Sequence, residues 1–69
     1  MSKNAEKLLA ALRKGPVKNF GGGICIPDPY EYLGFHTTEM YEAVQELRRQ
    51  GIEVERTDSG GNPTWEIKQ

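Results

Sequence analysis

Six side chains between residues 36 and 48 have the chemistry and the spacing to contact nucleic acid. They are His36, Thr37, Thr38, Tyr41, Gln45 and Arg48. Threonine and tyrosine hydroxyls can bind phosphates or bases, and a glutamine amide can pair with adenine. Met40, Val44 and Leu47 follow the i, i+4, i+7 pattern of a buried stripe, which turns the polar side chains outward. The segment therefore predicts a helix, from residue 37 or 38 to residue 50, that could lie in a major groove.

A second set of residues could hold the phosphate backbone, through basic side chains or through the close approach that glycine permits. These residues are Lys14, Lys18, Arg49, Arg56, Gly60, Gly61 and Lys68. Charges of the opposite sign stand on the same helix, at Glu39, Glu42 and Glu46, and at Asp58 in the last turn. Nine basic and ten acidic residues give a net charge of -1. Any affinity for nucleic acid must therefore come from a local patch rather than from bulk attraction.

Neither catalysis nor a bound metal or cofactor is indicated by the sequence. Cys25 and His36 are the only cysteine and histidine, and two such ligands do not build a usual structural zinc site. The glycines at 21–23 lack the Lys-Ser/Thr pair of a phosphate loop and suggest a flexible connector. We expect a protein that is not an enzyme. A single cysteine, no signal peptide and no apolar run of membrane-spanning length favour a cytoplasmic location.

The polar residues must be positioned by the elements around them. Ala5, Leu8, Leu9 and Leu12 form an apolar stripe at helical spacing, which predicts a helix over residues 3–14. Glycines and prolines then predict an irregular connection at 15–27, with one short strand at 24–26. A short helix follows from about residue 29 to residue 33, capped by Asp28.

After the helix that ends near residue 50, the chain has the pattern of a two-stranded ribbon. Residues 52–56 and 64–68 alternate in the manner of strands, and a turn rich in glycine separates them. Trp65 and Ile67 fall at strand spacing and are expected to face the core.

The run from Leu33 to Gly51 resembles the helix-turn-helix of the biotin-repressor-like winged-helix regulators. Leu33-Gly34-Phe35 is similar to their turn, Arg48 and Gly51 to the end of their recognition helix, and Ile52-Glu53-Val54 to the opening of their wing. The resemblance implies one α+β domain over residues 1–69, a small winged helix-turn-helix with three helices and a two- or three-stranded antiparallel wing sheet. The chain differs from that family in its long connection at 15–27 and in His36, which stands where the family has a serine in the turn.

Two functions remain open on these grounds. The resemblance implies sequence-specific binding of double-stranded DNA by a small transcription regulator or a phage- or plasmid-type accessory factor. A domain of this size offers few phosphate contacts, so high affinity would call for a homodimer or neighbouring copies. The alternative is a winged-helix adaptor that binds a protein partner through its acidic helix and its glycine-rich loop and does not bind DNA.

Overall fold

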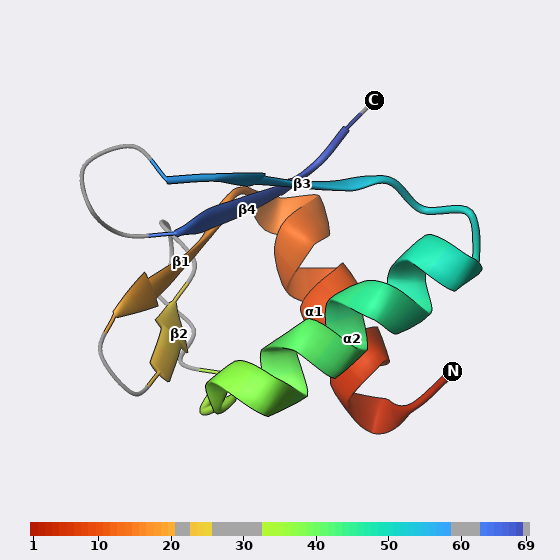
Figure 1. The fold of residues 1–69 in the computed structure, drawn as a ribbon, viewed down its shortest axis with the longest axis horizontal. Coiled ribbons are helices and arrows are strands. Elements are labelled where there is room, and N and C mark those ends of the chain that lie inside the picture. The colour runs from red at the N-terminus through yellow and green to blue at the C-terminus, as the bar shows by residue number, and fades with distance from the viewer. Residues whose placement is uncertain (21–22, 26–32, 59–62, 69) are drawn as a thin grey trace.

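The computed structural model describes residues 1–20, 23–25, 33–58 and 63–68 (Figure 1). Two helices and four strands lie within them. In chain order they are α1 (Lys3–Lys14), β1 (Val17–Phe20), β2 (Gly23–Cys25), α2 (Thr37–Arg49), β3 (Val54–Thr57) and β4 (Thr64–Ile67). The predicted α+β class is confirmed, and the strongly periodic segments are the two helices. Neither of these described helices is long and apolar enough to cross a membrane.

Each helix begins and ends at residues suited to that position. Ser2 caps α1, because its Oγ accepts a hydrogen bond from the Ala5 amide at 3.2 Å. α2 ends where Gly51 takes a φ of 86° and the Ile52 amide donates to the Leu47 carbonyl at 3.0 Å, as in a Schellman motif. Gly34, in the turn before α2, has a φ of 71°. Gly34 and Gly51 thus adopt the backbone conformation that side chains resist.

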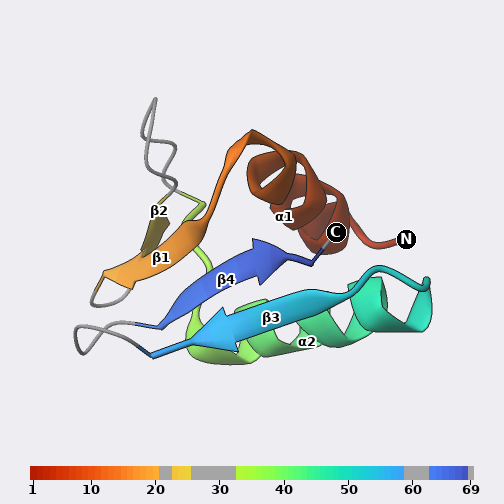
Figure 2. The same ribbon diagram turned by 90° about the horizontal axis from the view of Figure 1, so that it is seen from above.

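The strands form one antiparallel sheet in the order β2-β1-β4-β3. β4 and β3 lie on the same side of the two helices, β4 in contact with α1 and β3 with α2 (Figures 1 and 2). Val17 of β1 lies opposite Trp65 of β4, and Trp65 lies opposite Arg56 of β3. Because side chains alternate along a strand, this register directs Val17, Trp65 and Val54 toward the helices.

One apolar core joins the two helices to the sheet. It contains one stripe from each helix, the turn residue Phe35, and three strand residues. The members are Ala5, Leu8, Ala11, Leu12, Val17, Phe35, Met40, Ala43, Val44, Leu47, Val54 and Trp65. Leu8, Val17, Val44 and Leu47 have no exposed surface at all. The sequence predicted the inward stripe of α2 and the core position of Trp65 correctly.

The structure differs from the sequence prediction between the helices. The segment at 15–27 was expected to be irregular with one strand, but β1 and β2 form a hairpin within it. Val17 explains β1: its side chain is fully buried and its backbone pairs with β4, which no local pattern reveals. The sheet therefore has four described strands rather than two or three.

Three helices are not shown. The helix predicted near 29–33 lies mostly outside the described residues, and residues 33–36 are not helical. The third residue of the strand predicted at 24–26 also lies outside them.

Truncating the centre of the core should cost most of the stability. We expect Leu8→Ala to lower the free energy of unfolding by about 2–5 kcal/mol, because a fully buried leucine leaves a cavity. Leu9→Ala, one residue along and only half-buried, is the matched control and should cost clearly less. Urea unfolding followed by circular dichroism measures both. Equal losses for the two variants would contradict the assigned rotation of α1.

Candidate nucleic-acid interface

The outward surface of α2 carries the predicted contact residues. Thr37, Thr38 and Tyr41 are exposed, and 60% of the Tyr41 surface is accessible. Gln45 is half-buried, and His36 is exposed at the residue before the helix. Successive residues of an α-helix are rotated by about 100°. Because Met40, Val44 and Leu47 point into the core, the direction of every other side chain of α2 is then fixed. This rotation sorts the polar side chains into two edges.

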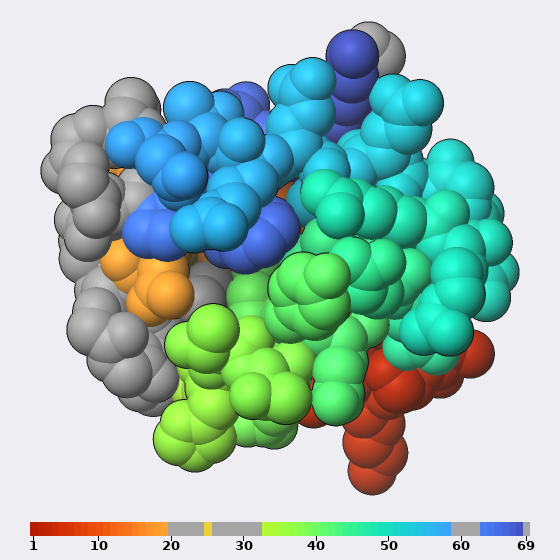
Figure 3. Space-filling view, in the orientation of Figure 1, coloured from red at the N-terminus to blue at the C-terminus, as the bar shows by residue number. Residues whose placement is uncertain are grey.

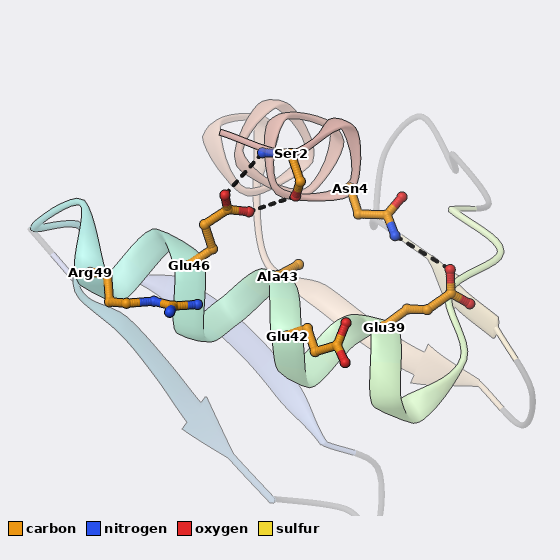
Figure 4. Close-up of a pocket in the computed structure, with 7 residues that line it drawn as sticks. All are labelled: Ser2, Asn4, Glu39, Glu42, Ala43, Glu46 and Arg49. Atoms are coloured by element: carbon orange, nitrogen blue, oxygen red, sulfur yellow. Dashed lines mark hydrogen bonds between the residues drawn. The ribbon is translucent and has the colours of Figure 1, made fainter.

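The edge toward α1 holds carboxylates, and α1 binds them (Figure 4). The Ser2 backbone amide donates to Glu46 Oε1 at 3.0 Å, and Ser2 Oγ donates to Glu46 Oε2 at 2.5 Å. Asn4 Nδ2 donates to Glu39 Oε2 at 3.3 Å. The other oxygen of Glu39 accepts from the His36 amide at 3.2 Å, which satisfies a donor at the start of α2. Both carboxylates therefore tie α2 to the N-terminal end of α1, and Glu39 also binds the start of its own helix.

These residues line a groove of about 330 Å³ between the two helices. Ala43 forms part of its floor, and Glu42 and Arg49 complete its lining on the α2 side (Figure 4). Glu42 makes no hydrogen bond or ion pair with the described residues and is exposed. Of the three glutamates that oppose DNA binding in the sequence, only Glu42 is thus left facing solvent.

The bonds from Ser2 lower the pKa of Glu46 below 4.5. The largest cause is the hydrogen bond from the Ser2 hydroxyl, followed by the one from the Ser2 amide; the positive charge of Arg49 adds to them. Hydrogen bonds that a carboxylate accepts favour its charged form. The contact between α1 and α2 at this end is consequently strongest when Glu46 is ionised.

The opposite edge of α2 faces the β3–β4 hairpin across a second hollow, of about 150 Å³. Its walls come from α2, β1 and the hairpin, whose surfaces meet around it in Figure 3. The described lining residues are Asn19, Thr37, Met40, Tyr41, Arg56, Pro63 and Trp65. Two predicted base readers and one predicted phosphate ligand are therefore brought together here.

Arg56 and Trp65 form the hairpin side of this hollow. The Arg56 guanidinium carbon lies 5.6 Å from the centroid of the Trp65 ring, and Arg56 Nε lies 3.2 Å from Asp58 Oδ1. That ion pair is exposed, and exposed pairs contribute only about 0–1 kcal/mol. Trp65 Nε1 is buried and has no hydrogen-bond partner among the described residues. A buried donor without an acceptor costs about 1–3 kcal/mol.

Arg48 has a structural role that the sequence did not indicate. Its Nη2 donates to the Val54 carbonyl of β3 at 2.9 Å. The Lys68 amide donates to the Glu53 carbonyl, which points toward β4, so the Val54 carbonyl points toward the open edge of the sheet. Arg48 therefore covers that edge and fixes the hairpin against α2. Part of the Arg48 donor set is thus used within the protein, and its contact with DNA stays a prediction.

The other basic candidates do not form one patch. Lys18 alternates with the buried Val17 and so lies on the outer face of the sheet. Lys68 Nζ lies 3.5 Å from Glu55 Oε1, and Lys14 lines a separate hollow that also includes Glu66. Arg49 is exposed on the groove side of α2. Gly60 and Gly61 lie outside the described residues.

Long-range contacts define most of what sequence reasoning missed. The Ser2–Glu46 and Asn4–Glu39 bonds join residues 44 and 35 positions apart. No local pattern marks Ser2 as a hydrogen-bond donor to Glu46. Among the described residues, no three His, Cys, Asp or Glu side chains gather to hold a metal ion.

Comparison of the chain with protein families, with curated proteins and with solved structures found no match.

The Ser2–Glu46 contact predicts a pH-dependent contribution to stability. Because folding lowers the pKa of Glu46, its contribution is complete above the unfolded value near 4.5 and is lost as pH falls through the folded value. We expect Glu46→Gln to be less stable than the parent at pH 7, with a difference that closes as the pH falls below 4.5. Glu53→Gln, which removes an exposed carboxylate outside the groove, is the control. A gap for Glu46→Gln that does not change with pH would refute the linkage.

Proposed function

We propose that the protein binds double-stranded DNA as a small transcription regulator or accessory factor, with α2 in the major groove. The observation that supports this most is the destination of the carboxylates. Glu39 and Glu46 are turned toward α1 and bonded there, so they do not face a ligand on the outer side of α2. Hydroxyl and amide groups occupy the exposed sector between Glu42 and the hairpin.

The geometry of α2 suits a major groove. An α-helix fits a groove about 12 Å wide, and the residues near its N-terminus reach the base edges. Thr37 and Thr38 lie in the first turn, Tyr41 in the second, and Gln45 in the third. The N-terminal amides of the helix add partial positive charge where phosphates would approach. We assign Thr38 and Gln45 to contacts with base edges. We assign Thr37 and Tyr41 to contacts with the DNA strand that would lie beside the β3–β4 hairpin.

The arrangement of the sheet is compatible with a winged helix. β3 and β4 form the hairpin after α2, and β1 adds to it from the segment after α1. In this arrangement the hairpin acts as the wing, and Arg56 is its basic residue nearest α2. Arg56 is then the main phosphate ligand. Because one such residue provides little affinity, we expect two copies to bind neighbouring half-sites.

A protein-binding adaptor is the second candidate, and the groove between α1 and α2 favours it. That groove is larger than the hollow beside the hairpin, and Glu42 on its lining has no partner among the described residues. A basic peptide would complement it. The two candidates use opposite edges of the same helix, so single substitutions on each edge separate them.

Removing Arg56 should reduce the salt dependence of DNA binding. We expect Arg56→Ala to weaken binding to a mixed-sequence duplex and to reduce the slope of log K against log salt by about 0.9, which corresponds to one lost phosphate contact. Lys7→Ala removes the same charge from the exposed side of α1 and should leave the slope unchanged. Fluorescence anisotropy between 25 and 200 mM salt, roughly the range in which such slopes are measured, provides both values. No binding of duplex at the lowest salt would reject the DNA proposal in favour of the adaptor.

Neutralising Glu42 should have the opposite effect. Glu42→Gln removes the one glutamate of α2 that faces solvent without a partner among the described residues. We expect tighter binding to non-specific duplex at low salt, by roughly 2- to 10-fold, since a like charge near phosphates is repulsive. Glu6→Gln, exposed on the first turn of α1, controls for net charge. An unchanged affinity for Glu42→Gln would place the DNA away from the outer face of α2.

A further inference from the structure

The hollow between α2 and the hairpin has features that duplex binding does not require. We propose that it is a site for one unpaired nucleotide of a DNA strand, with the base between Tyr41 and the Arg56–Trp65 stack and the phosphate at Arg56. Recognition of duplex by the outer face of α2 does not need such a site. The proposal therefore goes beyond the proposed function, and either can fail without the other.

The size of the hollow matches a single planar ring. Its volume is about 150 Å³. An engineered protein cavity of about 150 Å³ takes up benzene, which sets the scale for one aromatic group. A base pair would not fit. The hollow is thus matched to a base that has left its stack.

The lining has the chemistry that binds unstacked bases. Pro63 is half-buried, the buried Met40 and Trp65 form the apolar base, and Tyr41, a residue 60% exposed, lies on the helix side. Single-stranded nucleic acids are held by stacking on aromatic rings and on arginine planes, with cations along the backbone. Arg56 already lies against the Trp65 ring, at 5.6 Å from its centroid. An aromatic ring from α2 and the Arg56–Trp65 pair from the hairpin therefore both line a ring-sized space.

The charge of the hollow selects a nucleotide over a purely apolar group. Arg56 is the only charged residue among the described lining, and no carboxylate lies among them. Its partner Asp58 stands outside the hollow in an exposed ion pair, which a phosphate can displace. An apolar peptide side chain would use the ring surfaces but not the charge of Arg56.

Trp65 reports on the site directly, because it is the only tryptophan of the chain. The experiment compares three DNAs with the same duplex: one blunt, one with a three-nucleotide thymidine overhang, and one whose overhang is abasic. We expect the thymidine overhang to bind at least 5-fold more tightly than the blunt duplex and to quench Trp65 fluorescence. The abasic overhang keeps its phosphates but has no base to stack, so it should give neither the full gain nor the quenching.

Two variants separate stacking from general binding. Tyr41→Leu keeps apolar bulk but removes the ring, and should reduce the ratio of overhang to blunt affinity toward one, whatever its effect on duplex binding. Tyr41→Phe should restore the ratio. Thr38→Ala, on the outer face, should weaken both DNAs equally and leave the ratio unchanged.

The outcomes distinguish this site from the duplex proposal. Overhang-dependent quenching without affinity for blunt duplex would support the nucleotide site and reject the duplex function. Tight binding to blunt duplex with no gain from the thymidine overhang would overturn the nucleotide site alone. Equal gains from the thymidine and abasic overhangs would also overturn it, because phosphates alone would then explain the effect.

Discussion

The apolar contact between α1, α2 and the sheet is the constraint on which the surface chemistry depends. Leu8, Val44 and Leu47 are fully buried, and together they fix the rotation of α2 about its axis. If α2 were rotated by about 100° around its axis, each position on its surface would be occupied by the adjacent residue in the sequence, and different side chains would face α1 and the hairpin. With the observed rotation, Glu39 and Glu46 reach the N-terminal end of α1, while Thr37 and Tyr41 line the hollow beside the hairpin. Packing in the interior thus determines which charges a ligand would meet.

This sorting changes the meaning of a nearly neutral composition. Ten acidic residues against nine basic ones argue against a nucleic-acid ligand when charges are only counted. Two of the glutamates on α2 instead accept hydrogen bonds from Ser2 and Asn4. Arg48 likewise has a structural role, because its hydrogen bond to the Val54 carbonyl holds β3 against α2 and covers the open edge of the sheet. Several charged residues are therefore engaged in hydrogen bonds within the protein.

The sequence predicted the structure correctly where apolar periodicity and residues at helix ends determine it. The stripes in residues 3–14 and 40–47, with Gly34 and Gly51 flanking the second, located both described helices and their inward faces. Strand alternation placed Trp65 in the core. The sequence failed for β1, because the pairing of Val17 with Trp65 joins distant segments and because the nearby glycines suggested a loop. The helix predicted near 29–33 was not tested by the described residues.

The site itself was only partly predictable. Helical spacing identified Thr37, Thr38 and Tyr41 as exposed, and the structure confirms this. The hollow beside the hairpin was not foreseen, because it depends on the distance between α2 and β3, which packing sets. The same is true of the hydrogen bonds that engage the glutamates. Whether basic residues converge is also a question of tertiary structure, and Lys18 and Lys68 lie on the outer side of the sheet, away from α2.

The most direct test of the central claim is a titration of amide chemical shifts with mixed-sequence duplex DNA at low salt. If α2 presents its hydroxyl-bearing side to DNA, the largest shifts will fall on residues 37, 38, 41 and 45 and on Arg56, while Ser2, Asn4 and Glu46 stay in place. Flat spectra, or shifts confined to the groove between α1 and α2, would contradict the account.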